Sequence, residues 1–365
     1  MTPLKTLQDH LLNEKIDLAI INNPASIAYF TGFISEPHER IFLLFVTPED
    51  SYLFTPMLDK AEAQAASGLS VYGYEDADDP WQVIDKTILS SLNPLKTVAI
   101  QEDSLTVAWF HALTPFLNEA NLTDISNTLD QIKRLKTSEE IQKLHESGQL
   151  ADEAIKVGIE SLRVGISEEE VVAIIEFEMK KRGVSKMSFP TMVLFGDHAA
   201  SPHGTPGKRQ LQPNELVLFD LGVIYNGYAS DMTRTVCFGD VSDEIKSIYQ
   251  IVLEAQETAQ KSASPGMTAH ELDQVARDII EEAGYGEYFM HRLGHGIGQS
   301  VHEYPNIRPG NDLPLDEDMC FSIEPGIYIP DYVGIRIEDC VHLTDHGAES
   351  FTHHPKELQI IPIKN

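Results

Sequence analysis

The chain has 365 residues, of which 42% are hydrophobic, so it is long enough for two domains with separate cores. Its 57 acidic residues against 27 basic ones give a formal net charge of −30, which excludes nucleic acid as a partner because phosphates require a basic surface. No apolar run reaches transmembrane length and the N-terminal segment lacks the pattern of a cleavable signal, so we expect no membrane partner and a cytoplasmic location.

Short apolar segments alternate with helical patterns in the first third of the chain. Helical patterns lie near residues 57–66, 80–91 and 105–117. The segments rich in β-branched and aromatic residues are typical of strands, and they cover residues 16–21, 40–46, 51–55, 69–74 and 97–101. This alternation predicts an α/β domain with a partly parallel sheet over residues 1–125.

Residues 126–136 form the expected linker, which contains no low-complexity sequence. Beyond it, helical periodicity covers residues 137–161, 167–183, 242–263 and 268–283. Thr268 precedes Glu271 by three positions, which is the pattern of a capping box at a helix start. Hairpin patterns between these helices predict an α+β domain over residues 137–365.

Three cysteines, Cys237, Cys320 and Cys340, are too few and too scattered for a disulfide framework or a CxxC metal site. Each lies inside an apolar strand pattern. We therefore expect buried free thiols.

Four distant segments carry acidic residues and a histidine of the types that bind metal. They are FDLGVIYNGYASDMTRT (219–235), HRLGHGIGQSVHE (291–303), SIEPGIY (322–328) and GIRIEDCV (334–341). The candidate ligands within them are Asp220, Asp231, His295, Glu324 and Glu338. Four carboxylates and one imidazole are a hard, oxygen-rich set, which favours Mn²⁺-like ions over a thiolate-type structural zinc site.

The register of one hairpin follows from its turn. Residues 215–219 and 228–237 are strand-like, and Asn226-Gly227 between them indicates a type I′ turn. With that turn centre, Asp220 pairs with Thr233, and period-two alternation places Asp231 on the same face. The two carboxylates are then diagonal neighbours, about 7–8 Å apart at the backbone.

Alternation predicts a second pair of carboxylates. In MCFSIE, Glu324 lies on the face opposite Ile323, and in GIRIED, Glu338 lies with Arg336 on the face opposite Ile337. The apolar residues can face a core while the acids line a cleft, where a divalent cation would relieve their repulsion. The alternative is a set of acidic residues on solvated strand faces.

Four histidines lie in or near these segments: His203, His291, His295 and His302. An isolated histidine is most often a core or surface residue, so their grouping is what indicates a function. Glycines at 294, 296 and 298 argue against a helix that carries His291 and His295. The VHE at 301–303 is not a zincin signature, because no second histidine follows and Pro305 would interrupt the helix.

The ligand order Asp, Asp, His, Glu, Glu resembles the pita-bread metallopeptidases, in particular their Xaa-Pro branch, which contains prolidase and aminopeptidase P. The resemblance covers the chain from about residue 134 to its end. RLKTSEEIQKL (134–144) resembles the opening helix of that domain, and FGDHAASPHGTPG (195–207) resembles its substrate-side loop with His203. The resemblance implies an α/β creatinase-like N-terminal domain followed by an α+β pita-bread catalytic domain.

The resemblance also implies two divalent metal ions in each subunit, Mn with Co or Zn as alternatives. Asp220 would bind one ion, His295 and Glu324 the other, and Asp231 and Glu338 would bridge them. A hydroxide activated by both metals would attack the scissile carbonyl. Glu324 would move the proton, His302 would donate to the oxyanion, and His203 would complete the catalytic set.

The implied reaction is hydrolysis of the Xaa-Pro bond in dipeptides, which releases free proline. The substrate-binding residues would be His291, Arg292 and Arg336, together with His38 from the SEPHER loop (35–40) of the N-terminal domain. Arg292 or Arg336, with His203, would clamp the free proline carboxylate.

Three other functions remain possible on the sequence alone. An aminopeptidase P would remove the first residue from longer Xaa-Pro peptides. A metal-free creatinase-like hydrolase or a non-catalytic binding protein would be expected to lack several of the five ligands. Small proline-containing peptides are the expected partners, and a homodimer is the family expectation.

Overall fold

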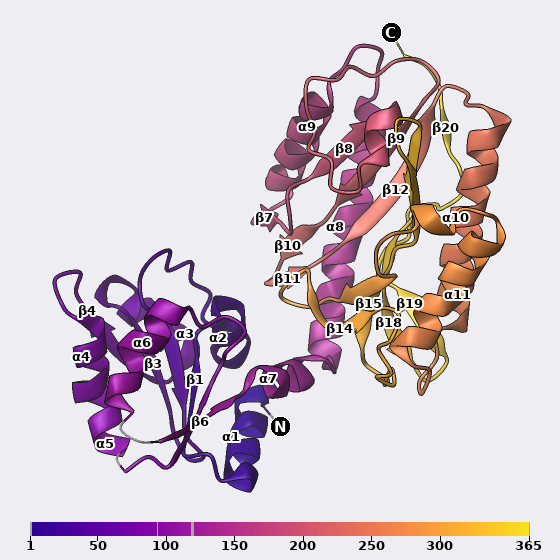
Figure 1. Ribbon diagram of the computed structural model, residues 1–365. Helices are drawn as coiled ribbons and strands as arrows, with labels where there is room; N and C mark the ends of the chain where they lie inside the picture. Colours follow the sequence, from indigo (N-terminus) through magenta and orange to yellow (C-terminus); the bar gives the residue numbers. More distant parts are fainter. Residues whose placement is uncertain (1, 93, 118–119, 365) are drawn as a thin grey trace. The chain divides into compact units, whose positions relative to one another are not determined.

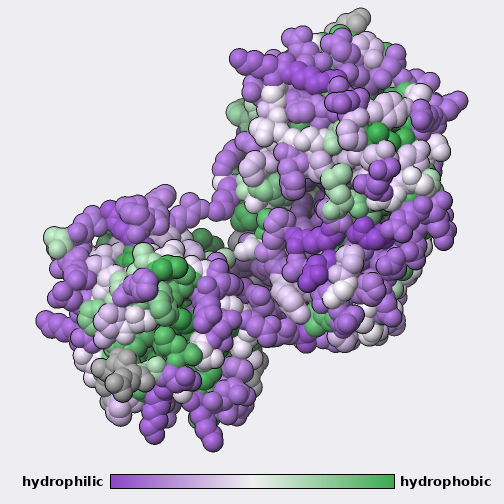
Figure 2. Space-filling view, in the orientation of Figure 1, coloured by the Kyte–Doolittle hydropathy of each residue, from purple (hydrophilic) through white to green (hydrophobic). Residues whose placement is uncertain are grey.

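The computed structural model describes residues 2–92, 94–117 and 120–364. The chain divides into two compact units, Met1–Lys133 and Arg134–Asn365 (Figure 1). The division lies inside the range 126–136, and most of that range is helix α7 (Ser126–Lys133) of the first unit. Most of the visible surface of the second unit is hydrophilic (Figure 2), in keeping with the net charge of −30.

The first unit is built on a six-stranded sheet with the order β4-β3-β2-β1-β5-β6. Strand β1 pairs in parallel with β5 and antiparallel with β2, so the sheet is partly parallel, as predicted. Edge strand β6 was not predicted, because Asn-Leu-Thr-Asp has no apolar alternation. The strands are β1 (Leu18–Ile21), β2 (Leu43–Val46), β3 (Ser51–Pro56), β4 (Ser70–Tyr74), β5 (Thr97–Ile100) and β6 (Asn121–Asp124).

Helices cover both faces of this sheet. In β1, Ala19 and Ile21 join one hydrophobic core, whereas Leu18 and Ile20 join the other. The first core is closed by α1 (Pro3–Glu14), α2 (Pro24–Thr31), α3 (Lys60–Ser67) and α7. The second is closed by α4 (Pro80–Ile84), the helical turns η2 (Asp85–Leu89) and α5 (Ser90–Leu92), and α6 (Val107–Leu113).

Four long helices of the second unit lie where the periodicity predicts them. They are α8 (Ser138–Ser161), α9 (Glu168–Lys181), α10 (Asp243–Ser262) and α11 (Ala269–Glu282). Capping boxes begin three of them, including the predicted box of Thr268 and Glu271. Helices α8 and α9 pack against one sheet, and α10 and α11 pack against another (Figure 1).

Two main sheets meet between these helix pairs. The first has the order β20-β12-β9-β8 and the second the order β14-β13-β15-β18-β19. Their strands are β8 (Met192–Phe195), β9 (Glu215–Leu221), β12 (Met232–Phe238), β13 (Gly294–Gly296), β14 (Glu303–Ile307), β15 (Cys320–Ile323), β18 (Asp339–Thr344), β19 (Gly347–Ser350) and β20 (Ile360–Ile361). Two smaller sheets contain the remaining strands, which are β7 (Lys186–Met187), β10 (Val223–Tyr225), β11 (Tyr228–Ala229), β16 (Gly326–Ile329) and β17 (Val333–Arg336).

The predicted hairpin register is confirmed. Tyr225 pairs with Tyr228 around the turn, and Asp220 pairs with Thr233 further along. Asn226 and Gly227 both have positive φ angles, as a type I′ turn requires. The predicted strand 228–237 is divided into β11 and β12 around Asp231, so this ligand candidate lies at the point where the hairpin passes from one sheet to the next.

Two predictions about the whole chain can also be compared with the structure. Cys237, Cys320 and Cys340 are buried and unpaired, as predicted. Within the described residues, we find no helix with the length and apolar character needed to cross a membrane.

Candidate metal centre

The five predicted ligands come from both sheets of the second unit. Asp220 lies in β9, Asp231 precedes β12 and His295 lies in β13. Glu324 follows β15, and Glu338 lies between β17 and β18. Because each position is at or next to a strand end where the two sheets approach each other, residues more than one hundred positions apart converge.

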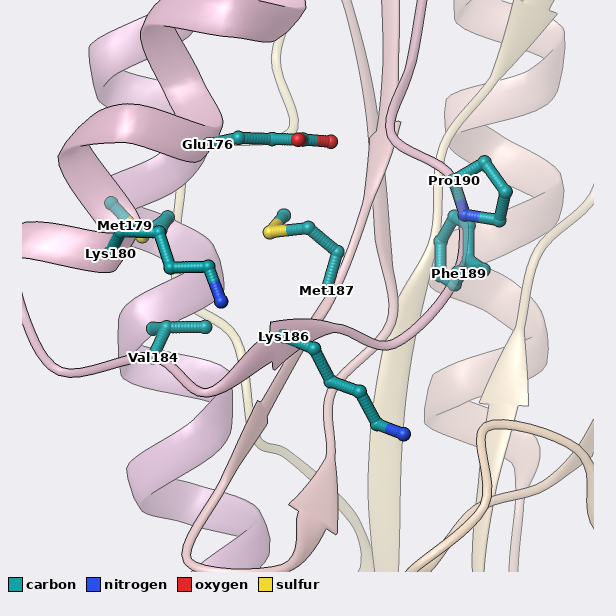
Figure 3. A pocket seen from close by; sticks show the side chains of 8 residues that line it. All are labelled: Glu176, Met179, Lys180, Val184, Lys186, Met187, Phe189 and Pro190. Atoms are coloured by element: carbon teal, nitrogen blue, oxygen red, sulfur yellow. The ribbon is translucent and has the colours of Figure 1, made fainter. Parts of the chain in front are cut away.

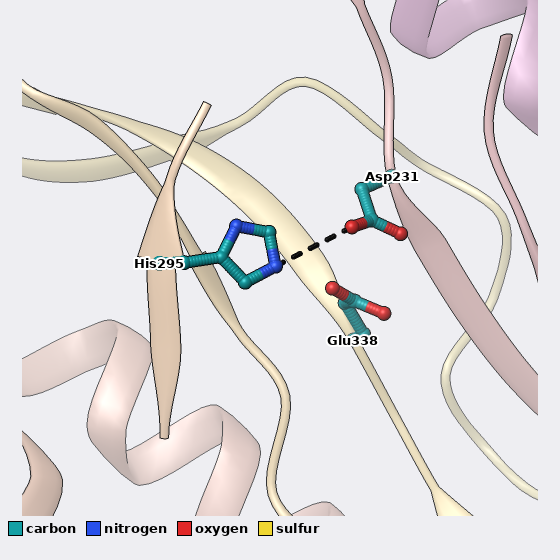
Figure 4. Close-up of side chains that lie close together, drawn as sticks. All are labelled: Asp231, His295 and Glu338. Carbon is teal, nitrogen blue, oxygen red and sulfur yellow. Dashed lines mark ion pairs between the residues drawn. The ribbon is translucent and has the colours of Figure 1, made fainter. Parts of the chain in front are cut away.

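Three of these side chains form a group whose spacing could hold a metal ion (Figure 4). Ligand atoms of Asp231, His295 and Glu338 all lie within 4.8 Å of one another, and all three residues are buried. His295 Nε2 is 3.5 Å from Asp231 Oδ2 and 3.3 Å from Glu324 Oε1. Glu324 therefore joins the same cluster through the imidazole.

The imidazole of His295 is oriented for metal binding. Its backbone N–H donates to Ser322 Oγ at 3.0 Å, and Ser322 Oγ donates to Glu324 Oε1 at 3.1 Å. His295 Nδ1 is 3.1 Å from the carbonyl oxygen of Gly296 and donates to it. Its other ring nitrogen, Nε2, then faces two carboxylates, an arrangement that a metal cation between them would stabilise.

The electrostatics of the cluster also indicate a bound cation. Burial raises the pKa of Asp231 well above its usual range, and the charges of neighbouring carboxylates raise it further. Burial and nearby carboxylates have the same effect on the pKa of Glu338. For Glu324, burial acts upward, but the hydrogen bond and positive charge of His295 outweigh it and lower the pKa to about 2.

The donor set fits a divalent cation. Among the described residues, Asp220 Oδ1 and Glu338 Oε1 are buried carboxylate oxygens without a hydrogen-bond partner. Leaving a buried carboxylate oxygen unsatisfied is costly, and a cation would satisfy both oxygens. The oxygen-rich composition suits Mn²⁺-like ions, and the single imidazole also suits Zn²⁺ or Co²⁺.

Arg336 is bonded to one of the predicted ligands, Asp220. It is buried, its Nη2 forms an ion pair with Asp220 Oδ2, and its Nε donates to Thr233 Oγ1 at 3.0 Å. Nη1 donates to Tyr328 Oη at 2.7 Å. Because three of the five N–H donors of the guanidinium make these bonds, we propose that Arg336 positions Asp220.

Arg234 holds a second ligand in place, and the sequence interpretation missed it. Its Nη1 donates to the carbonyl oxygen of Thr233 at 2.9 Å and to that of Glu338 at 2.6 Å. Its Nη2 pairs with Asp339 Oδ1 at 2.7 Å, and both side chains are fully buried. An arginine within an otherwise buried strand is the signal that could have revealed it.

The histidines outside the ligand set lie around this cluster. The ring of His302 is 4.2 Å from that of His295, edge to face. Loss of hydration and the positive charges of His295 and Arg292 lower the pKa of His302 to about 4, so its imidazole is neutral near pH 7. His203 is exposed and follows the 3-10 helix η4 (Gly196–Ala200), which leads out of β8.

The remaining substrate-binding candidates belong to both units of the chain. His291 Nδ1 donates to the carbonyl oxygen of Arg292 at 2.7 Å, and His291 Nε2 lies 3.1 Å from Tyr328 Oη. Burial lowers the pKa of His291. Arg292 donates to Asn306 Oδ1. His38 belongs to the first unit, where it is exposed and has a φ angle of 55°.

A cavity of about 400 Å³ lies elsewhere in the second unit (Figure 3). Its lining comes from α9 and from the segment around β7, and includes Met179, Met187, Phe189 and Glu176. None of the predicted site residues lines it. The metal cluster is therefore the stronger candidate for the functional site.

Comparison with known proteins agrees with the geometry. Residues 142–345 match the model of metallopeptidase family M24, and residues 3–134 match the Creatinase/Prolidase N-terminal domain. The chain belongs to metallopeptidase family M24. The predicted creatinase-like and pita-bread domains are thereby confirmed.

Several known proteins are similar to this chain over almost its full length. The chain is 48% identical over 366 residues to an Xaa-Pro dipeptidase of Lactobacillus helveticus, covering 99% of this chain and 100% of that one. The structure of a prolidase from Pyrococcus horikoshii OT3 is similar, with a TM-score of 0.90, 34% identity, and coverage of 98% and 99%. An X-Pro aminopeptidase from Thermotoga maritima MSB8 has the same TM-score and coverage, with 33% identity.

Proposed function

We propose that this protein is a metal-dependent Xaa-Pro dipeptidase, which hydrolyses the bond before proline in a dipeptide and releases free proline. The observation that carries the proposal is the buried convergence of Asp231, His295 and Glu338, joined by Glu324. The full-length similarity to an Xaa-Pro dipeptidase supports the substrate class.

We infer that Asp220, Asp231, His295, Glu324 and Glu338 hold two divalent ions, with Mn favoured over Co or Zn. Bound there, such ions would supply a Lewis acid and lower the pKa of water toward neutrality. Arg336 fixes Asp220, and Arg234 fixes the backbone at Glu338. These bonds keep the carboxylates aimed at a common point although they repel one another.

Glu324 is the proposed proton carrier. Its Oε1 lies 3.3 Å from His295 Nε2, and Ser322 Oγ orients the same oxygen by a hydrogen bond of 3.1 Å. It would take a proton from the attacking water and pass it to the proline nitrogen as the bond breaks. That nitrogen has no N–H, so it needs a delivered proton to leave as a secondary amine.

His302 and His203 are the proposed groups on the substrate side. Because the pKa of His302 is low, its ring is neutral and can donate one N–H to the carbonyl oxygen as negative charge develops there. Arg292 and His203 are the proposed partners of the free proline carboxylate. His291 would line the substrate pocket.

Aminopeptidase P activity is the second candidate, because the Thermotoga X-Pro aminopeptidase matches the fold as well as the prolidase does. Product analysis on Leu-Pro and on Leu-Pro-Xaa tripeptides, with defined Mn²⁺, separates the two. We expect free proline from Leu-Pro and intact tripeptides. Release of leucine from the tripeptides at a comparable kcat/KM would establish the aminopeptidase instead.

The metal requirement has its own test. Removal of metal with a chelator should abolish hydrolysis of Leu-Pro, and added Mn²⁺ should restore it. Glu324→Gln should lower kcat by about a hundredfold or more, since it removes the proton carrier. Full activity after metal removal, or unchanged turnover in Glu324→Gln, would contradict the proposed chemistry.

We also infer a homodimer, which the family resemblance implies, and a cytoplasmic location, which the few scattered cysteines favour. Light scattering on the purified protein would measure the subunit number directly.

A further inference from the structure

A buried carboxylate lies behind the loop that carries His203. This loop starts at Phe195, the last residue of β8, and returns at Gly207. Glu168, the first residue of α9, is completely buried. Its Oε1 accepts from the backbone N–H of Phe195 at 2.9 Å, and its Oε2 accepts from that of Gly207 at 2.9 Å. One side chain thus closes both ends of the loop.

The same carboxylate also binds the middle of the loop. His198 Nδ1 lies 2.8 Å from Glu168 Oε1 and 3.0 Å from Oε2, and donates to them. Glu168 is not needed to cap its own helix, because Ser167 and Glu170 form the capping box of α9. The bonds that its carboxylate makes to Phe195, His198 and Gly207 therefore serve the loop, and the positive end of the helix dipole stabilises its charge.

The opposite side of the loop is held by close backbone packing. A Cβ atom at Gly334, in β17, would lie 1.7 Å from the carbonyl oxygen of Ala199. The turn η4 therefore packs directly against β17, two residues before Arg336. His203, which is exposed, lies between η4 and Gly207 and therefore belongs to the segment that these contacts hold.

We propose that Glu168 is a positioning residue, which holds loop 195–207 and with it His203, the residue proposed to bind the proline carboxylate. This inference rests on the proposed function, because it acts through the substrate-side role of His203. Glu168 touches neither the substrate nor the ligand residues. Its effect on catalysis is exerted through the loop.

Glu168→Gln tests the proposal, with Glu169→Gln as the matched control. The new side-chain amide would turn an NH₂ group toward N–H donors, so at least one end of the loop loses its acceptor. Glu169 is the next residue, is exposed, and loses the same charge. For Leu-Pro we expect KM to rise about tenfold in Glu168→Gln with a smaller change in kcat, and neither to change by more than about twofold in Glu169→Gln.

A double-mutant cycle identifies the route of the effect. If Glu168 acts through His203, then Glu168→Gln should add little to the loss already caused by His203→Ala. Fully additive losses would overturn the proposal. His198→Ala is a milder variant that keeps both backbone bonds to Glu168, and it should give an intermediate rise in KM even if Glu168→Gln folds poorly.

Hydrogen–deuterium exchange gives a readout that does not depend on activity. In Glu168→Gln, the backbone amides of residues 195–207 should exchange faster, while those of β9 and β12 stay protected. Unchanged exchange in the loop would contradict the proposal that Glu168 holds it in place. If the wild-type protein cleaves no Xaa-Pro peptide, the proposed function fails, and the exchange experiment still decides whether Glu168 holds the loop.

Discussion

At the scale of single residues, the metal centre is a set of carboxylates that would not be buried together without a cation. Asp231 and Glu338 have raised pKa values because they are buried beside other carboxylates. Asp220 and Glu338 each have a buried oxygen with no hydrogen-bond partner among the described residues. The same features that destabilise the metal-free fold therefore create its affinity for metal.

The burial of several carboxylates together predicts that the stabilisation of the fold by metal depends on pH. A carboxyl group whose pKa is raised by folding stabilises the fold below its unfolded pKa of about 4, and that contribution is lost as pH rises through the folded pKa. Mn²⁺ must also displace any bound protons. We therefore expect the rise in melting temperature on adding Mn²⁺ to be larger at about pH 8 than at about pH 5.

Thermal scans with Mn²⁺ or with chelator across this pH range measure that rise. Asp231→Asn is the control, since it removes one of the raised carboxyl groups and should flatten the dependence. A rise that is the same at both pH values would show that these carboxylates do not govern metal binding.

At the scale of elements, a buried ion pair joins the start of α8 to the segment that carries His302. Lys136 Nζ lies 3.0 Å from Glu303 Oε2, and both side chains are almost fully buried. Glu303 Oε1 also accepts from the backbone N–H of Ser300 at 3.1 Å. The pair therefore fixes the loop next to His302 as well as the entry of the helix.

Lys136→Met should reveal the strength of this link. The substitution removes the cation beside a buried carboxylate, which typically costs about 3–5 kcal/mol of folding free energy. Lys143→Met is the matched control, because Lys143 pairs with the exposed Glu139 and the loss should be at most about 1 kcal/mol. Urea denaturation of both variants measures the difference. Equal losses would mean that the buried pair contributes no more than a surface pair.

The elements that could be predicted from sequence are those specified by local interactions. Asn226-Gly227 determines its own turn, and period-two alternation then places Asp231 on the face of Asp220. Thr268 and Glu271 likewise mark a helix start by contacts three residues apart. Strand β6 escaped prediction because its pairing with β5 supplies the stability that its polar sequence lacks.

Contacts between distant segments could not be predicted. Alternation places Arg336 and Glu338 on one face, but it does not show that Arg336 pairs with Asp220. Glu168 looks like any acidic residue in the first turn of a helix until the loop at Phe195 and Gly207 folds back onto it. These partners are set by how the sheets and helices pack, and a single sequence does not report that packing.

At the scale of the whole molecule, the two units contain different spectroscopic and chemical groups. The chain has two tryptophans, Trp81 and Trp109, and both lie in the first unit with ring centroids 6.1 Å apart. The predicted metal ligands all lie in the second unit. Tryptophan fluorescence therefore reports on one unit, while metal acts on the other.

Because the tryptophans and the predicted ligands lie in different units, we expect the effect of metal on the unfolding midpoint to depend on the spectroscopic probe. Mn²⁺ at about one hundred times its Kd should stabilise the second unit by about 3 kcal/mol, which far-UV circular dichroism would detect as a shifted transition. The midpoint followed by tryptophan fluorescence should move much less, since the first unit contains no predicted ligand. Identical shifts by both probes would show that the two units unfold as a single cooperative body.

The burial of Cys237, Cys320 and Cys340 has a practical consequence for studying that behaviour. A hydrophilic thiol reagent reaches exposed cysteines far faster than buried ones, so the native protein presents it with no ready target. One cysteine introduced in place of Glu62 and another in place of Glu169, both exposed positions in different units, would be the two accessible thiols. A pair of fluorophores or spin labels attached there would measure the separation of the two units during turnover, with every native cysteine left in place.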